Sequence, residues 1–142
     1  MKVRDILLNK GETVYTVGPK ATVLETLKLM ADKNIGSIPV IEGDALLGIF
    51  TERDYARKII LKGKFSKDIP VDEVMHETVT VKEEDDIGYC MKLMTDKFVR
   101  HLPVIRQGKL AGIISIGDVV KAIISEQEFV INNLSNYIAG TR

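Results

Sequence analysis

Two short stretches of the sequence carry a glycine, a hydroxyl and a carboxylate at the same spacing. The first is GIFTERD at residues 48–54 and the second is GIISIGD at residues 112–118. A hydroxyl can donate to a phosphate oxygen, and an ionised carboxylate accepts hydrogen bonds from two neighbouring hydroxyls, such as those of a ribose. Free amides at a helix start attract phosphate, and glycine lets a ligand approach the backbone closely. The motif therefore fits the ribose-phosphate part of a nucleotide.

The same spacing also has a purely structural interpretation. Ser/Thr-x-x-Asp is a weakened capping box, in which the hydroxyl and the carboxylate satisfy free backbone groups of the first helical turn. Duplication favours a binding function only in part, because a repeat copies its helix caps as well. By spacing alone, both interpretations remain open.

The motif closes a longer internal duplication. The stretch 38–54 (IPVIEGDALLGIFTERD) aligns without a gap with 102–118 (LPVIRQGKLAGIISIGD), an offset of 64 residues. Upstream, residues 3–7 (VRDIL) resemble 71–75 (VDEVM) at an offset of 68, so the first copy has four extra residues around Asn9–Glu12. The chain is therefore a tandem repeat.

The duplication predicts the domain organisation and the fold class. Repeat 1 spans 1–62, a linker 63–70, repeat 2 71–125, and a C-terminal helical tail 126–142. We expect an α+β protein in which each repeat has the order β-α-β-β-α and the two units bury their sheet faces against each other.

The first strand and the hairpin of each unit follow from short local patterns. The first strand is expected at 15–17 or 79–81, and the hairpin turn at 43–44 or 107–108. Thr22 and Glu25 predict a capping box at the first helix of repeat 1, and Asp86 is the expected cap in repeat 2.

Composition excludes several classes of function. The 142 residues include 20 basic and 20 acidic side chains, so the formal net charge is zero. Broad electrostatic binding to nucleic acid needs a basic surface, so no nucleic-acid partner is expected. Cys90 is the only cysteine, which excludes an intrachain disulfide and a cysteine cluster for zinc. No secretory signal or stretch of about 18 apolar residues is present, so we expect a soluble, cytoplasmic protein without a membrane contact or metal.

The ordered pattern resembles a pair of CBS (cystathionine β-synthase) domains. The initial VRDIL, the Thr-Val strand, the Pro-Val strand and the closing G-I-x-(T/S)-x-x-D motif occur in this order twice, over about residues 1–125. The resemblance implies a pseudo-two-fold pair with two clefts between the repeats. Such clefts often hold adenosine ligands such as AMP, ADP, ATP, S-adenosylmethionine or NAD. Such pairs regulate attached enzymes, transporters or kinases. Because the two repeats account for nearly the whole chain, it is similar to the stand-alone members.

The resemblance also implies composite sites, in which one repeat supplies the ribose-phosphate motif and the other the base pocket. The first cleft would combine Thr51 and Asp54 with Thr80, Val81, Arg100, His101, Leu102 and Pro103. The second cleft would combine Ser115 and Asp118 with Thr16, Val17, Ala21, Gly36, Ser37, Ile38 and Pro39. Main-chain groups near the threonines would read an adenine edge, and Ile38 or Leu102 would pack on its face.

Differences between the copies favour the first cleft as the phosphate site. Arg53 stands where the second copy has Gly117, and Arg100-His101 stand where the first copy has Gly36-Ser37. Arginine forks match phosphate oxygens. The competing interpretation is that Arg100 and His101 are simply surface residues at a strand start.

The sequence leaves rival functions to weigh. The two histidines and single cysteine supply no nucleophile–base–acid set, so an enzyme is not expected, although a small hydrolase using Asp54 or Asp118 is not excluded. The main alternative to nucleotide binding is a purely structural dimerisation module without ligand. We expect a homodimer, an unidentified target protein and no required cofactor, with an adenine nucleotide as the regulatory ligand.

Overall fold

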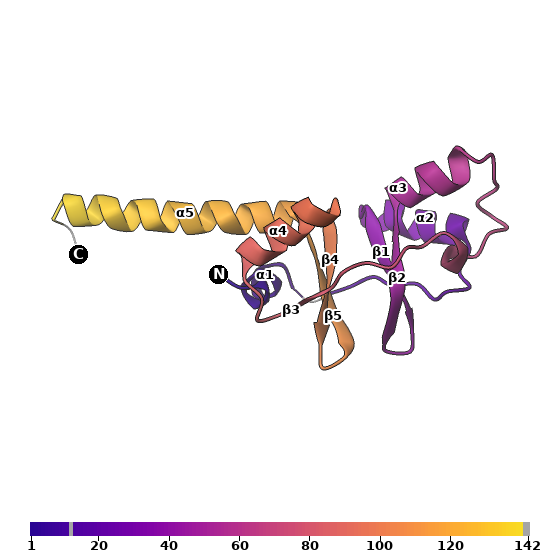
Figure 1. The fold of residues 1–142 in the computed structure, drawn as a ribbon, viewed down its shortest axis with the longest axis horizontal. Helices are drawn as coiled ribbons and strands as arrows, with labels where there is room; N and C mark the ends of the chain where they lie inside the picture. Colours follow the sequence, from indigo (N-terminus) through magenta and orange to yellow (C-terminus); the bar gives the residue numbers. More distant parts are fainter. Residues whose placement is uncertain (12, 141–142) are drawn as a thin grey trace.

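The computed structural model describes residues 1–11 and 13–140, in which helices and strands alternate (Figure 1). The helices are α1 (Val3–Lys10), α2 (Val23–Lys33), α3 (Glu52–Tyr55), α4 (Ile87–Lys97) and α5 (Ile116–Ile138). The strands are β1 (Ser37–Glu42), β2 (Ala45–Thr51), β3 (Val81–Lys82), β4 (His101–Arg106) and β5 (Lys109–Ser115). A π-helical turn, Ala56–Ile60, continues α3, and a short 3-10 turn spans Val71–Glu73.

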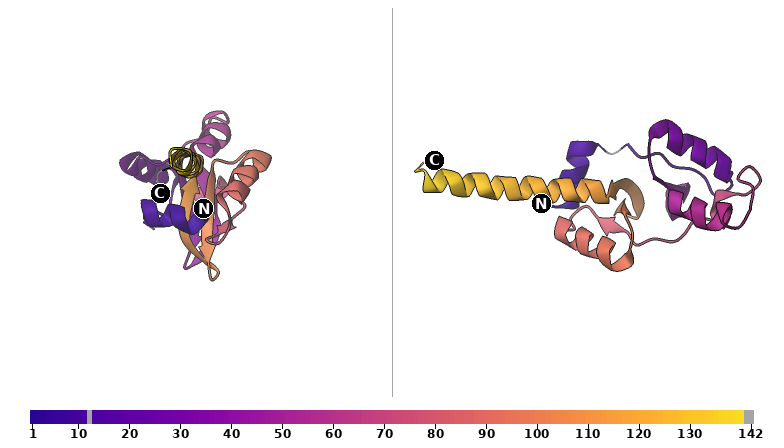
Figure 2. Two further views of the ribbon diagram at one scale, coloured as in Figure 1. Left: turned by 90° about the vertical axis from the view of Figure 1, so that its left-hand side faces the viewer. Right: turned by 90° about the horizontal axis from the view of Figure 1, so that it is seen from above.

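The hairpins of the two repeats are built alike and lie side by side. Strands β1 and β2 pair antiparallel with Ser37 opposite Thr51, and β4 and β5 pair antiparallel with His101 opposite Ser115. Both ladders shift register at the same place in the repeat, after Val40 and after Val104. Strands β2 and β5 contact each other where the hairpins meet (Figures 1 and 2). The expected α+β architecture of two paired CBS-like repeats is confirmed.

The hairpin turns lie where the sequence predicts them. Gly43 and Asp44 separate β1 from β2, and Gln107 and Gly108 separate β4 from β5. Gln107 and Gly108 both have positive φ, 52° and 77°, as a type I′ hairpin turn requires.

The first strands are shorter than the sequence predicts. In the described residues of repeat 1, the expected strand at 15–17 is reduced to one parallel bridge between Val17 and Val40. In repeat 2 the expected strand at 79–81 becomes the two-residue β3, whose Val81 pairs with Val104. This one bridge still fixes the segment against β1, because Val17 exchanges backbone hydrogen bonds with Pro39 and Ile41.

The helix caps follow the prediction in part. Thr22 and Glu25 form the expected capping box at the start of α2. Asp86 occupies the N-cap of α4, but its side chain makes no capping hydrogen bond. Asp85, one residue earlier, instead accepts a hydrogen bond from the backbone amide of Lys82 at 2.8 Å. Its carboxylate therefore stabilises the turn that leads into α4.

The leading segment of each repeat packs into the core of the other repeat. Val3, Ile6 and Leu7 of α1, a helix not expected from the sequence, lie in the core formed by β3, α4, β4, β5 and α5. Val71 and Val74 lie in the core formed by α2, β1 and β2. The sequence repeats are therefore not the packing units, and the segments 1–11 and 71–76 tie the two units together.

The motif glycines serve this exchange. A Cβ at Gly48 would lie 2.8 Å from the backbone oxygen of His76, and a Cβ at Gly112 would lie 2.7 Å from Cδ2 of Leu7. Gly48 and Gly112 therefore allow close approach of the crossed-over segments, rather than of a ligand as the sequence suggested.

Helix α5 runs from the motif of repeat 2 far beyond the rest of the molecule (Figures 1 and 2). It crosses the expected boundary between repeat 2 and the tail without a break. Most apolar side chains from Ile124 onward are exposed, among them Val130, Leu134 and Tyr137. No helix among residues 1–11 and 13–140 is both long and apolar enough to cross a bilayer.

Candidate functional site

Both copies of the motif form capping boxes. The hydroxyl of Thr51 accepts from the amide of Asp54 at 3.2 Å, and the Asp54 carboxylate accepts from the amide of Thr51 at 2.9 Å. Ser115 and Asp118 repeat this arrangement at 3.1 and 2.8 Å. The structural interpretation of the spacing is thus confirmed for both copies, and each carboxylate still has room for further partners.

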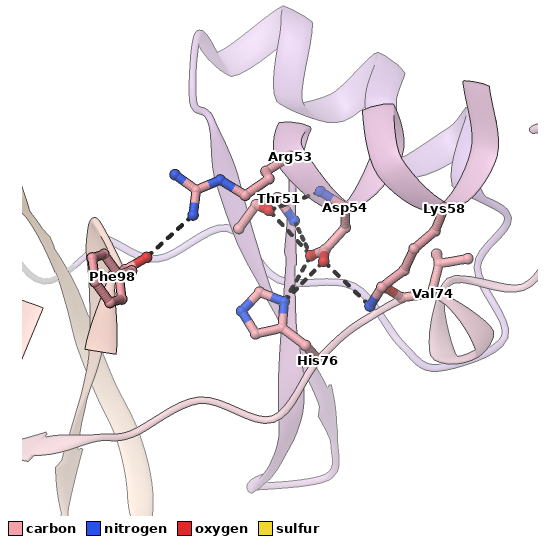
Figure 3. Close-up of polar contacts among 7 residues, drawn as sticks. All are labelled: Thr51, Arg53, Asp54, Lys58, Val74, His76 and Phe98. Atoms are coloured by element: carbon pink, nitrogen blue, oxygen red, sulfur yellow. Dashed lines mark hydrogen bonds and ion pairs between the residues drawn. The ribbon is translucent and has the colours of Figure 1, made fainter. Parts of the chain in front are cut away.

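Asp54 is held by side chains from outside its own motif (Figure 3). Nδ1 of His76 lies 2.8 Å from its Oδ2, and Nζ of Lys58 lies 3.3 Å from its Oδ1. Burial alone would raise the pKa of Asp54, but the hydrogen bond and charge of His76, the amide of Thr51 and the charge of Lys58 together hold that pKa below 3.8. Asp54 is therefore ionised at neutral pH although it is buried.

Asp118 has a different third partner. Nζ of Lys10, in the last turn of α1, lies 2.7 Å from its Oδ2 and donates a second hydrogen bond to the carbonyl of Ile113 at 2.9 Å. Burial raises the pKa of Asp118, but the hydrogen bonds from Lys10 and Ser115 outweigh it and keep the pKa below its ordinary value. Both motif carboxylates are thus contacted by the segment that crosses over from the other repeat.

A cleft of about 510 Å³ opens beside Asp54 and is lined by both repeats. From repeat 1 come residues of the motif and of the helix that follows it, Thr51, Glu52, Arg53, Asp54 and Arg57, together with Gly36 and Ile49. From repeat 2 come the end of α4 and the start of β4, Lys97, Phe98, Val99, Arg100 and His101, and the crossing residues His76 and Thr78. This is the composite arrangement expected of the first cleft.

Part of the predicted set for the first cleft lies elsewhere. Thr51, Arg53, Asp54, Arg100 and His101 all line it. Thr80 lines a separate hollow between the hairpins, and Pro103 is buried. Val81 and Leu102 have their side chains in the core, so Leu102 offers no exposed face to a base. The strand alternation explains this, because His101 and Leu102 point to opposite faces of β4.

The predicted set for the second cleft is not assembled around Asp118. The cleft of about 420 Å³ beside Asp118 is lined instead by α1 and α5, through residues such as Asn9, Lys10 and Lys121. Thr16 lines a different hollow near the hairpin turns. Ser37, Ile38 and Pro39 are buried, Val17 and Ala21 pack against the repeat 1 core, and Gly36 lines the first cleft. Ser115 serves as the cap of α5.

Several residues of the first cleft were missed by sequence reasoning. His76 ends the crossing segment 71–76, and its contact with Asp54 depends on an exchange that no local pattern encodes. Arg57 lies one helical turn beyond Arg53, and this spacing of like charges was an available signal. Phe98, which also lines the cleft, is exposed at the end of α4, so the apolar periodicity used to find core residues does not single it out.

The charge of the first cleft is mainly positive. Arg53, Arg57, Lys97 and Arg100 border it, against Glu52 and the already paired Asp54. His101 adds no charge, because burial, Lys10 and Arg100 lower its pKa further than Asp118 raises it. It remains a hydrogen-bonding group in a cleft whose electrostatics favour an anion.

Metal binding finds no support in the described side chains. Among residues 1–11 and 13–140, no group of three or more His, Cys, Asp and Glu side chains is placed to hold an ion. Cys90 is buried in the core, and burial raises the pKa of its thiol to about 11.

The fold and the site together define a class of protein. Two repeats, each with a hairpin between two helices, pair through their hairpins, exchange their leading segments, and form a composite cleft beside a repeated capping motif. The sequence pattern of the CBS domain matches residues 3–61 and 71–125, and the chain belongs to the CBS-domain family.

Relatives confirm this assignment over nearly the whole chain. A CBS-domain protein structure from Burkholderia ambifaria is 46% identical, superposes with a TM-score of 0.84, and is matched over 89% of this chain and 96% of that one. The mitochondrial CBS domain-containing protein CBSX3 of Arabidopsis thaliana is 42% identical over 148 residues, which cover 97% of this chain and 72% of that protein. A hexameric CBS-CP12 protein from bloom-forming cyanobacteria is 31% identical, with a TM-score of 0.74 over 84% of this chain and 70% of that one.

Proposed function

We propose that this protein is a regulatory module that binds an adenine nucleotide, AMP or ATP, in the cleft beside Asp54. CBS pairs are generally regulatory modules, and many bind adenosyl ligands. One observation carries the proposal: Arg53, Arg57 and Arg100, from different repeats, border a single cleft that also contains the Thr51–Asp54 motif. Guanidinium groups match phosphate oxygens in bidentate fashion, so this cleft suits a phosphorylated ligand better than a neutral one.

The binding step requires an exchange at Asp54. Its carboxylate accepts from the amide of Thr51 at 2.9 Å and is contacted by His76 at 2.8 Å and by Lys58 at 3.3 Å, so a ribose diol would displace the His76 and Lys58 contacts. Two hydrogen bonds from the diol would replace these two contacts, while the arginines hold the phosphate. Ligand binding at Asp54 would therefore free His76 from this contact and change the environment of the segment that crosses between the repeats.

The regulatory output follows from the composite lining. A ligand that contacts Arg53 of repeat 1 and Arg100 of repeat 2 is stabilised only when the repeats keep their relative position, so binding rigidifies the pair. A target protein, still unidentified, would sense this change, without catalysis by the module. NAD and S-adenosylmethionine are the alternative ligands, and the cytoplasmic location stays a prediction because one relative is mitochondrial.

Calorimetric titration with AMP and ATP tests the proposal on Asp54→Ala. Removal of the acceptor for two ribose hydroxyls, each worth about 1.5–3 kcal/mol when the partner is charged, predicts at least a ~10-fold loss of affinity. Asp54→Ala also removes a cap, so urea unfolding is measured in parallel. Arg100→Ala, an exposed change outside the cap, should weaken ATP binding without lowering stability.

The competing function, a structural dimerisation module, predicts a different result. Wild-type protein would then bind neither nucleotide, and Asp54→Ala would only lose about 0.5–2 kcal/mol of stability from the broken cap. Asp118→Ala is the matched control, because it breaks the same capping box outside the arginine-lined cleft. Its nucleotide affinity should equal that of the wild type.

A further inference from the structure

Phe98 adopts a backbone conformation that its side chain disfavours. It ends α4 in the left-handed region, with φ 55° and ψ 39°. Bulky L-residues rarely occupy this region, because Cβ approaches the following carbonyl oxygen. The equivalent position of repeat 1 is Asn34, which has φ 54° and ψ 50° and is the residue type that tolerates this conformation. Repeat 2 therefore has a strained phenylalanine at the position where repeat 1 has an asparagine, which adopts this conformation more readily.

Packing does not account for this phenylalanine. Phe98 is 81% exposed, although an aromatic ring gains most stability when it leaves water. It borders the cleft beside Asp54, together with Lys97 and Arg100. An exposed aromatic residue in a strained conformation beside a binding cleft is the kind of outlier that points to a role in binding.

A hydrogen bond from the other repeat holds Phe98 in place. Nη1 of Arg53 donates to its carbonyl oxygen at 3.2 Å, across the cleft from Asp54 (Figure 3). Arg53 thus joins the motif helix to the end of α4, and it fixes the backbone that carries the ring. Phe98 of repeat 2 and Asp54 of repeat 1 thus line the same cleft.

We propose that Phe98 contacts the ligand directly and stacks on its purine base. This inference rests on the proposed function and adds the group that recognises the base, which Leu102 cannot supply from within the core. Stacking on an aromatic ring tolerates any base, so Phe98 contributes affinity, while the choice of adenine comes from hydrogen bonds at the base edge.

Calorimetric titration with AMP separates stacking from general apolar contact. Phe98→Leu keeps the approximate volume but removes the π-face, and Phe98→Ala removes both; each should weaken AMP binding about 10-fold, within the range of one lost base–aromatic stack. Phe98→Trp should bind AMP at least as tightly as the wild type. Phe65→Ala removes another exposed phenylalanine, in the linker, and should leave the affinity unchanged.

A fourth variant tests the strain independently of the ligand. Phe98→Asn should unfold at a higher urea concentration than the wild type and yet bind AMP as weakly as Phe98→Ala. Wild-type affinity for AMP in Phe98→Ala would overturn the stacking role while leaving the proposed function intact. Absence of AMP binding by the wild-type protein would overturn both. An altered sedimentation coefficient with unchanged affinity would assign Phe98 to an interface between copies, which also overturns the inference.

Discussion

The two motif aspartates show how one local pattern acquires two chemical environments. Each caps its helix in the same way, but Asp54 meets the imidazole of His76 and Asp118 meets the ammonium of Lys10. The difference follows from the unequal lengths of the crossing segments. The four extra residues of repeat 1 extend α1 so that Lys10, in its last turn, reaches Asp118. Repeat 2 has only a short 3-10 turn, and His76 lies three residues after its end.

Asp54 should make folding stability depend on acid pH. Its pKa in the folded protein lies below 3.8, so its stabilising contribution is complete above about pH 3.8 and is lost as the pH falls through the lower folded value. Asp54→Asn should lower the free energy of unfolding at pH 7 by about 1–3 kcal/mol and flatten its decrease in acid.

Urea unfolding between pH 2.5 and 7 measures this dependence. Asp96→Asn is the control, because Asp96 pairs with Lys92 on the exposed surface of α4, where such pairs contribute little. Parallel acid profiles for wild type and Asp54→Asn would show that the His76 contact does not stabilise the fold.

At the scale of elements, the crossing segments explain the repeated glycines. The segment after Val74 lies so close to β2 that the amide of Ile49 donates to the carbonyl of His76 at 2.9 Å, and His76 returns a bond to Ile49 at 3.0 Å. Helix α1 approaches β5 through the side chain of Leu7. The same glycine therefore faces rigid backbone in one repeat and a side chain in the other.

This difference predicts unequal costs for the same substitution. A methyl group at Gly48 would meet the backbone oxygen of His76, which cannot move without breaking the bridge, so Gly48→Ala should cost about 1–3 kcal/mol. Gly112→Ala meets only the end of the Leu7 side chain, which can change rotamer, and should cost less. Thermal or urea unfolding of the two variants measures the contrast, and a larger loss for Gly112→Ala would contradict it.

At the scale of the whole molecule, the exposed apolar surface bears on how two copies would pair. The sequence predicts a homodimer through helix faces around 27–31 and 91–94, with the tail helix 126–138 against the partner. Met30 and Met94 are buried in the cores, whereas Leu27 and Met91 are only partly buried. Exposed apolar side chains gather on α5, which extends away from repeat 2 on the side opposite repeat 1 (Figure 1). Ile124, Ile131 and Ile138 recur every seven residues with Leu134 on the same face, a spacing typical of paired helices.

We expect a homodimer in which the exposed parts of α5 pair with those of a second copy. The chain between residues 122 and 140 contains no Lys or Arg, so this face is better suited to another helix than to an anionic membrane surface. Sedimentation at micromolar concentration should give a dimer for the wild type and a larger monomer fraction for Leu134→Glu.

Phe129→Glu is the matched control for the dimer. Phe129 is also exposed, but helical geometry puts it on the side of α5 opposite Ile131, so its substitution should leave the dimer intact. A wild-type protein that sediments only as a monomer would rule out this assembly.

The features that the sequence by itself determined are either local patterns of a few residues or consequences of the internal repeat. Hairpin turns at Gly43-Asp44 and Gln107-Gly108, the capping boxes and the α+β repeat follow from turn chemistry, caps and apolar spacing, which act within a few residues. The resemblance to CBS pairs implied a cleft shared by the two repeats, and Arg53 and Arg100 line one such cleft. Only the tertiary structure decided three features: the exchange of leading segments, the partners His76 and Lys10 of the motif carboxylates, and the different linings of the two clefts. These depend on contacts between residues far apart in the chain, such as those of Val3, Ile6 and Leu7 with the core of repeat 2, and no local pattern encodes them.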